Sequence, residues 1–123
     1  MFTGIIEEVG TICDVRQSGE AMEMIVASKR VITDVQLGDS ISVNGVCLTV
    51  TRFTDDSFSV DIMPETVRAT SLRGLTKGNK VNLERAMSAN GRFGGHFVSG
   101  HVDGIGTILS KKESIMPFTT VLV

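Results

Sequence analysis

Four side chains of this sequence could act as a nucleophile, a proton carrier or a metal ligand: Cys13, Cys47, His96 and His101. A cysteine attacks as its thiolate, and a histidine moves protons or binds a metal ion. A lone cysteine on a strand is more often a small core residue than a nucleophile. The histidines stand five positions apart (101 − 96 = 5), which on a strand places them on opposite faces. With no CxxC pair either, we expect no metal site and no disulfide.

The strongest local signal surrounds Cys47 and predicts a hairpin. Two alternating segments, 41–43 and 46–51, flank the pair Asn44-Gly45. This pair favours a two-residue type I′ turn, because both positions tolerate a positive φ. In the second strand we expect one face to hold Val46, Leu48 and Val50 and the other to hold Cys47, Thr49 and Thr51.

Further strands are expected on both sides of this hairpin. The segments rich in Val, Ile and Thr are 4–13, 21–27, 58–62 and 80–85, with a short helix over 30–36 and a helical turn over 65–70. Pro64 ends the ladder of the strand before it, since proline has no N–H to donate. Turn signals recur about every ten residues, which suggests a small antiparallel barrel or sandwich.

Composition excludes several classes of protein. The 123 residues are 41% apolar and 21% charged, which is typical of one globular domain, or of one domain and part of another. No apolar run approaches the ~20 residues of a membrane span, and the N-terminus does not read as a signal peptide. The net charge of −2 predicts no nucleic-acid binding. The sparse cysteines fit a cytoplasmic protein.

An internal repeat divides the chain. FTGIIEEVGTI at the start aligns with VSGHVDGIGTI, so that Gly4 matches Gly100 at an offset of 100 − 4 = 96 residues. Gly10, Thr11 and Ile12 have identical counterparts at that offset. We therefore expect one complete unit at 1–96 and the first two strands of a second unit at 97–123. Two full units would require ~70 further residues, so the chain reads as a fragment.

Five segments together resemble the riboflavin synthase α-subunit family. They are MFTGIIEEVG at the start, GDSISVNGVCLTV at 38–50, VDIMPETVRATSL at 60–72, VNLERA at 81–86 and GGHFVSGHVDGIGTI at 94–108. They occur in the family's order and spacing. The resemblance implies an all-β fold, with a six-stranded antiparallel Greek-key barrel that binds lumazine at 1–96. The first strands of a second, truncated lumazine-binding barrel follow at 97–123.

The resemblance also implies an enzyme, a transferase of riboflavin biosynthesis. Its reaction is the dismutation of two 6,7-dimethyl-8-ribityllumazine molecules to riboflavin and 5-amino-6-ribitylamino-pyrimidinedione, without a cofactor. This truncated chain alone is expected to be weakly active or inactive. The alternative is a non-catalytic lumazine- or flavin-binding protein of the same fold. Intact MPET and SGH motifs at 63–66 and 99–101 favour the enzyme. The family is trimeric, and for this fragment we expect a dimer or small oligomer.

Four segments carry the ligand site that the resemblance implies. The expected substrate-binding residues are Gly4, Ile5, Ile6, Cys47, Leu48, Thr49, Asp61, Ile62, Met63, Pro64, Glu65, Thr66, Gly100, His101 and Val102. A flat heteroaromatic ring needs apolar walls and a few fixed hydrogen bonds at its edge, which strand backbone and threonine hydroxyls supply. His101, as a base, and Cys47 are the catalytic candidates. The 96-residue offset assigns Gly4-Ile5-Ile6 to the first copy of the site and Gly100-His101-Val102 to the second.

Overall fold

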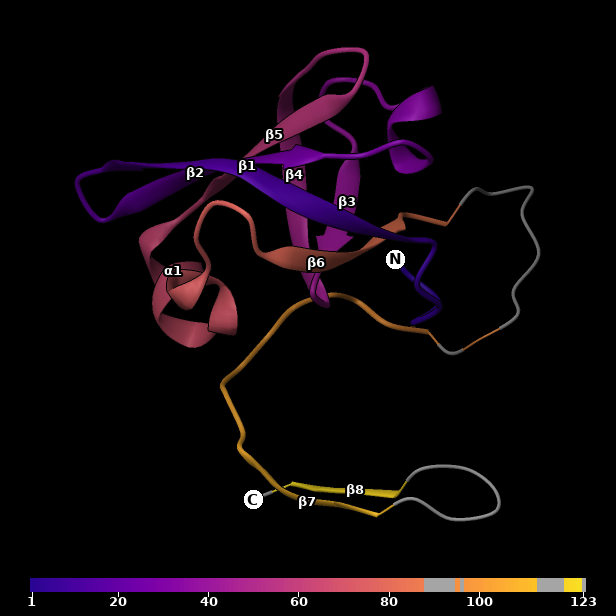
Figure 1. Cartoon of the computed structure of the whole chain (residues 1–123), viewed down its shortest axis with the longest axis vertical. Coiled ribbons are helices and arrows are strands. Elements are labelled where there is room, and N and C mark those ends of the chain that lie inside the picture. The colour runs from indigo at the N-terminus through magenta and orange to yellow at the C-terminus, as the bar shows by residue number, and fades with distance from the viewer. Residues whose placement is uncertain (88–94, 96, 113–118, 123) are drawn as a thin grey trace.

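The computed structural model describes residues 1–87, 95, 97–112 and 119–122. Within them, six antiparallel strands close a barrel in the order β1-β2-β5-β4-β3-β6 (Figure 1). The strands are β1 Glu8–Ser18, β2 Ala21–Ala27, β3 Ser40–Val43, β4 Val46–Phe53, β5 Ser57–Ile62 and β6 Lys80–Arg85. Because β5 rather than β3 lies beside β2, the topology is a Greek key. The predicted barrel is confirmed.

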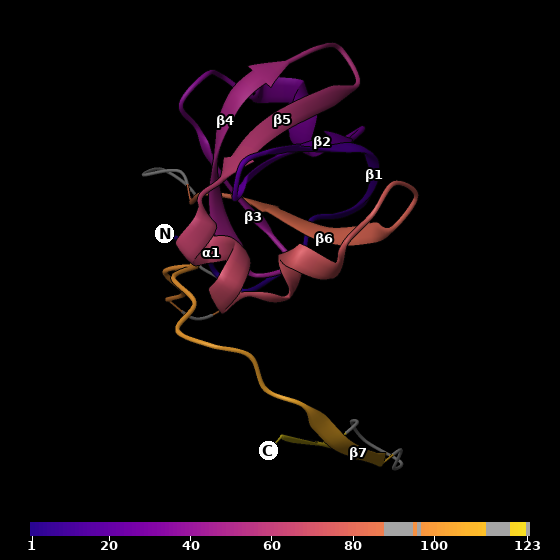
Figure 2. The same cartoon turned by 90° about the vertical axis from the view of Figure 1, so that its left-hand side faces the viewer.

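Short helical segments connect these strands. The 3-10 helices are η1 Val31–Asp34 and η2 Ser71–Gly74, and α1 spans Pro64–Ala69. Proline stands at the start of α1, where its missing N–H costs nothing. Figure 2 shows α1 beside one end of the barrel, where the segment after residue 97 also passes. No helix in the described part of the chain is long and apolar enough to cross a membrane.

Alternating side chains from the strands fill the interior of the barrel. In β4 the burial alternates as predicted, with Val46, Leu48 and Val50 inside. The inward side chains of the other strands join them; those with no measurable exposure include Met24, Val26, Val43, Phe58, Val60, Ile62 and Leu83. This core gives the barrel a rigid wall on which exposed side chains are held.

The Asn44-Gly45 hairpin is confirmed in detail. Asn44 has φ 49° and Gly45 has φ 83°, and Val43 pairs with Val46 across the turn. Two consecutive positive φ values define the type I′ turn. The turn fixes the register of β3 and β4, and so the outward direction of Cys47 and Thr49.

The first strand begins later than the sequence predicts. β1 starts at Glu8 rather than at Gly4, and it continues to Ser18. Gly4 has φ 85°, a conformation outside the β region that turns the chain away from the barrel. Residues 4–7 are therefore a separate bend in front of β1.

A second hairpin outside the barrel repeats the first one. β7 (Ile108–Lys112) and β8 (Thr119–Leu122) pair with Ile108 opposite Leu122. In the β1–β2 hairpin the corresponding pair is Ile12 opposite Val26, and both members shift by 96 residues. The irregularity in register also recurs at the equivalent place, after Ile12 and after Ile108. The sequence repeat therefore has a structural counterpart (Figure 1).

Candidate functional site

The candidate site lies where β4 and β5 stop pairing. Their ladder runs from Val50–Val60 to Phe53–Phe58, so the first half of β4 is not paired with the end of β5. Val50 donates its N–H toward the β3 side, to the carbonyl of Asp39 at 2.9 Å. Backbone N–H groups alternate along a strand, so those of Cys47 and Thr49 point to the other side, toward β5. The sequence-predicted segments 47–49 and 61–66 thus both begin where this ladder ends, and β4 presents an edge there that is not paired with β5.

Gly100 occupies part of this edge. Its carbonyl accepts a hydrogen bond from the Cys47 N–H at 2.8 Å, in the place where a strand partner would stand. A Cβ on Gly100 would lie 2.7 Å from Cys47 Cβ and 3.1 Å from Phe2 Cε2, and φ there is 78°. Glycine is therefore required on two counts, contact and conformation. Val102, two residues on, packs against the core cluster.

The turn around Gly100 has a twin at the N-terminus. His101 donates its N–H to Ser99 Oγ at 3.2 Å, and Ile5 donates its N–H to Thr3 Oγ1 at 3.1 Å. Both central glycines have positive φ, 78° at Gly100 and 85° at Gly4. Such a hydroxyl-to-backbone bond stabilises a tight turn. The two members of the repeat thus share one local structure.

These twin turns are joined by a backbone bridge. Phe2 donates to the Val98 carbonyl at 2.7 Å, and Val98 donates to the Phe2 carbonyl at 2.9 Å. Residues 2 and 98 are equivalent at the 96-residue offset. An antiparallel pair formed by equivalent residues is the arrangement that a local two-fold axis produces. Phe2 is buried by this contact, at 1% exposure.

The predicted site residues divide into three groups. The first group surrounds the contact between Cys47 and Gly100. Its other members are residues with exposed side chains, Thr49, Asp61, Met63, Glu65 and His101, and residues with partly buried side chains, Pro64, Thr66 and Val102. Leu48 and Ile62 are core residues, at 4% and 0% exposure, so only their backbone is able to face a ligand. The third group is Gly4-Ile5-Ile6, which the sequence analysis placed with Cys47. Gly4 lies instead near Val98 and is bonded to Glu84.

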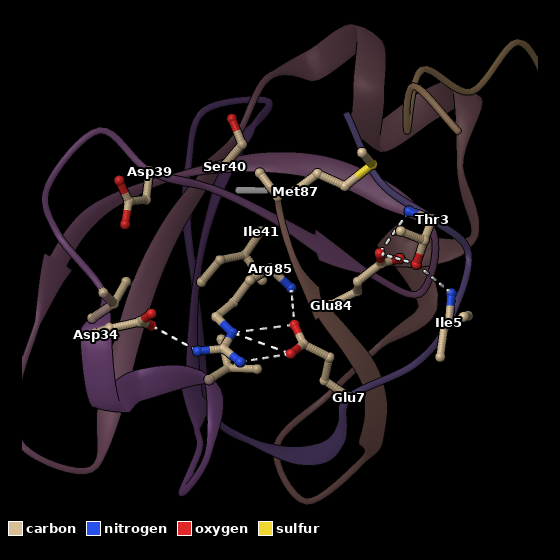
Figure 3. A pocket seen from close by; sticks show the side chains of 13 residues that line it. Thr3, Ile5, Glu7, Asp34, Asp39, Ser40, Ile41, Glu84, Arg85 and Met87 are labelled. Atoms are coloured by element: carbon tan, nitrogen blue, oxygen red, sulfur yellow. Dashed lines mark hydrogen bonds and ion pairs between the residues drawn. The ribbon is translucent and has the colours of Figure 1, made fainter. Parts of the chain in front are cut away.

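A separate pocket of about 690 Å³ lies behind the N-terminal bend (Figure 3). Of the predicted site residues it includes only Ile5. Arg85, the one basic residue among its described lining residues, is paired with two of its carboxylates. Arg85 donates to Glu7 at 2.6 Å and to Asp34 at 3.0 Å. The hydrogen bonds from Arg85 hold the pKa of Glu7 below its usual value, and those to Glu7 and then Asp34 raise the pKa of Arg85. We therefore interpret these charged groups as structural: Arg85 on β6 holds the N-terminal bend through Glu7 and the η1 helix through Asp34.

A family profile described as lumazine binding domain matches residues 3–86. The chain belongs to the lumazine-binding domain family. The riboflavin synthase of Bacillus amyloliquefaciens is 68% identical over 93% of this chain and 54% of that protein, and that of Bacillus subtilis is 65% identical over 92% and 53%. The chain thus spans about half the length of these curated relatives.

Solved structures of the same fold carry ligands of one chemical class. A structure of LumP with 6,7-dimethyl-8-(1'-D-ribityl) lumazine matches with a TM-score of 0.85 and 27% identity, covering 98% of this chain and 67% of that one. LumP with riboflavin matches with a TM-score of 0.84. The recognition of the family from sequence motifs is confirmed.

Sequence reasoning missed several residues of this region. Phe2, Val98 and Glu84 were not among its candidates, although Phe2 and Val98 lie inside the aligned repeat. The pairing of Thr3 with Ser99 in that alignment was a usable signal, since a hydroxyl before glycine favours this turn. His96 lies outside the described residues. No group of three side chains in the described ranges is arranged to hold a metal ion.

Proposed function

We propose that this chain is the ligand-binding first half of a riboflavin synthase. Residues 1–96 form its complete lumazine-binding barrel, and residues 97–123 begin a second one. The observation that carries the proposal is the Gly100–Cys47 contact, which joins two predicted ligand segments at an unpaired strand edge. The identity of 68% with a riboflavin synthase and the repeated hairpin register support it.

The edge suits a ribityllumazine chemically. A pyrimidinedione alternates carbonyl and N–H groups, as a peptide edge does, so it can pair with strand backbone at Thr49 and Asp61. Met63 and Val102 are apolar groups beside this edge that can form its walls. Asp61 and Glu65, both exposed, can accept from ribityl hydroxyls.

The local two-fold relation makes the site reciprocal between the two units. The second unit contributes Gly100-His101-Val102 to the first barrel, as its contact with Cys47 supports. By the same operation, Gly4-Ile5-Ile6 would serve the second barrel, and the Gly4 carbonyl would face the residue 96 positions after Cys47. Ile5 and Ile6 are 51% and 44% exposed here, which fits a surface made for that partner.

The proposed reaction transfers four carbons from one lumazine to another and is balanced without an oxidant. A proton leaves the acidic C7 methyl of the donor, and the carbanion forms the first carbon–carbon bond to the acceptor. A second carbon–carbon bond closes the new ring, and the two carbon–nitrogen bonds that held the four-carbon unit in the donor break. The released nitrogens take up protons, which yields riboflavin and the pyrimidinedione. His101 is exposed beside the Gly100 turn and is our candidate base, and Cys47 lies at the edge where the acceptor would sit. Holding two rings in register supplies most of the rate enhancement.

A fluorescence titration tests the binding part. The chain should quench riboflavin fluorescence at roughly 10–100 µM, with about one ligand per chain. The ribityllumazine should compete. Absence of quenching over that range would remove the assignment of this edge as the ligand site.

The second candidate is a non-catalytic lumazine- or flavin-binding protein, which the LumP complexes favour. Turnover separates the two. A chain extended through the whole second unit should convert ribityllumazine to riboflavin, whereas the 123-residue chain should be far slower. An extended chain that binds ligand tightly but forms no riboflavin would support the non-catalytic candidate.

We also propose self-association and a cytoplasmic location for this protein. A dimer or small oligomer would cover the exposed isoleucines of the N-terminal bend. The described cysteines, Cys13 and Cys47, are both free thiols, which fits a reducing compartment.

A further inference from the structure

Glu84 is a buried carboxylate that holds the N-terminal turn. It is 4% exposed and lies on β6, whose pairing with β1 and β3 fixes the backbone on both sides. Its Oε2 accepts from the Thr3 N–H at 2.7 Å and from Thr3 Oγ1 at 2.8 Å, and its Oε1 accepts from the Gly4 N–H at 3.1 Å. No cation in the described ranges pairs with it. Three donors from one turn thus satisfy a buried negative charge.

A second carboxylate fixes the other end of the same bend. Glu7 accepts from the Arg85 N–H at 2.7 Å and from its guanidinium, and the Glu7 N–H bonds to the Leu83 carbonyl at 2.9 Å. The Glu84 carboxylate on β6 thus accepts hydrogen bonds from the bend 3–7, and the Glu7 carboxylate in the bend accepts hydrogen bonds from Arg85 on β6, as Figure 3 shows. The bend is a rigid element of the barrel.

This rigid bend continues directly into the bridge that carries Gly100. Phe2 precedes Thr3 and pairs with Val98, and Gly100, two residues after Val98, bonds to Cys47. Phe2 Cε2 also lies where a Cβ on Gly100 would come within 3.1 Å. The Thr3–Gly4 turn is therefore linked to the Gly100 carbonyl, and through it to the Cys47 N–H, by consecutive backbone contacts.

We propose that Glu84 is a positioning residue for the ligand edge. It acts through the Phe2–Val98 bridge rather than by touching ligand. The inference deepens the proposed function and rests on it for the ligand, but the coupling from Glu84 to Cys47 is measurable without one. A carboxylate is required because Gln in either orientation would set an N–H donor against the Gly4 or the Thr3 donors.

The test compares Glu84→Gln with the matched variant Glu8→Gln. Glu8 also accepts several bonds, from Ser28 Oγ and from the N–H groups of Lys29, Arg30 and Val31, but holds a different loop. In flavin titration of the 123-residue chain, Glu84→Gln should raise Kd about tenfold, the scale seen for groups that orient binding residues. Glu8→Gln should leave Kd unchanged. Equal Kd values for Glu84→Gln and the wild type would overturn the inference and leave the proposed function standing.

Hydrogen exchange supplies a readout that needs no ligand. The protection of the Cys47 amide, taken relative to that of Val26 in the core, should fall in Glu84→Gln and stay constant in Glu8→Gln. If the protection falls in Glu84→Gln as expected but the wild-type chain binds no flavin, the proposed function is wrong and the coupling from Glu84 to Cys47 still holds. Unchanged relative protection in Glu84→Gln would refute the coupling. If Glu84→Gln does not fold, Thr3→Val and Thr3→Ser take its place. Only Thr3→Val, which removes the hydroxyl, should lower the protection of the Cys47 amide and weaken flavin binding. Equal protection and equal Kd in the two variants would count against the inference.

Discussion

Phe2 and Val98 exchange two backbone hydrogen bonds, of 2.7 and 2.9 Å, although 96 positions separate them in the sequence. The bridge places the start of each repeat beside the start of the other. Gly100 follows Val98 and its carbonyl accepts from the Cys47 N–H, so the edge that we propose for the ligand includes residues that the repeat assigns to the second unit.

Replacing Gly100 by alanine should abolish flavin binding while the barrel remains folded. A Cβ at this position would lie 2.7 Å from Cys47 Cβ, in a backbone conformation that side chains disfavour. The turn must then move away from β4. Fluorescence titration measures the effect, with Gly104→Ala as the control, since nothing lies within 4 Å of a Cβ there. Wild-type affinity in Gly100→Ala would show that the contact is not part of the site.

Replacing Gly10 by alanine should destabilise the barrel itself. A Cβ would come within 2.6 Å of Leu83 Cδ1 and 2.8 Å of the Ala27 carbonyl oxygen, and the backbone atom cannot move aside by a rotamer change. Overpacking of this kind costs about 1–3 kcal/mol. Urea unfolding should show the loss, whereas Gly74→Ala, where a Cβ meets nothing within 4 Å, should differ little from the wild type.

The free energy of unfolding should decrease on acidification because of Glu7 and Glu8. Hydrogen bonds from Arg85 lower the pKa of Glu7. Burial alone would raise the pKa of Glu8, but the bonds from Val31, Lys29, Ser28 and Arg30 outweigh it and leave that pKa lowered too. Between the lowered pKa values of the folded state and the unfolded pKa of 4.5, the unfolded chain binds more protons than the folded chain. The stabilisation by the two carboxylates is therefore fully present above pH 4.5 and is lost as the pH falls through their folded pKa values.

Glu7→Gln isolates one of these contributions. The variant should be less stable than the wild type at pH 7. The difference should shrink as pH falls below 4.5, because Glu7 of the wild type becomes protonated first in the unfolded chain and then, at lower pH, in the folded one. Chemical denaturation at several pH values measures both quantities. A difference that stays constant with pH would mean that the charge of Glu7 does not contribute.

The chain should associate at micromolar concentration. The N-terminal bend exposes Ile5 and Ile6, and Phe97, which directly precedes Val98 of the bridge to Phe2, is 72% exposed. Burying such a patch favours a dimer or small oligomer. Sedimentation velocity should detect it, and the double change Ile5→Ser, Ile6→Ser should shift the distribution toward monomer. A wild-type chain that remains monomeric at high concentration would contradict the prediction.

Much of the barrel could be predicted because it depends on local patterns. The Asn44-Gly45 turn fixes its own geometry, and the alternation in β4 fixes which side chains enter the core. The repeat likewise predicted two further strands after residue 97, the region that holds β7 and β8. These features need only neighbouring residues and a period.

The parts that could not be predicted depend on contacts between distant segments. The residue pattern of 4–13 predicts a strand that includes the N-terminal bend. In the structure the N–H groups of Thr3 and Gly4 donate to the Glu84 carboxylate and not to a neighbouring strand. Gly4 and Gly100, which the repeat aligns, both have positive φ. The sequence alone did not show that the Gly100 turn, rather than the Gly4 turn, lies against Cys47.

The bridge also sets an order for assembly as the chain leaves the ribosome. All ladders of the first barrel are present once Arg85 has emerged, so its core can form early. Phe2, in contrast, has to wait for Val98, and the Cys47 edge waits for Gly100. Closing so long a loop comes late because its entropy must be overcome first. The barrel is therefore built before the proposed ligand edge is complete, and a nascent chain halted between the two would hold a folded barrel without the Gly100–Cys47 contact.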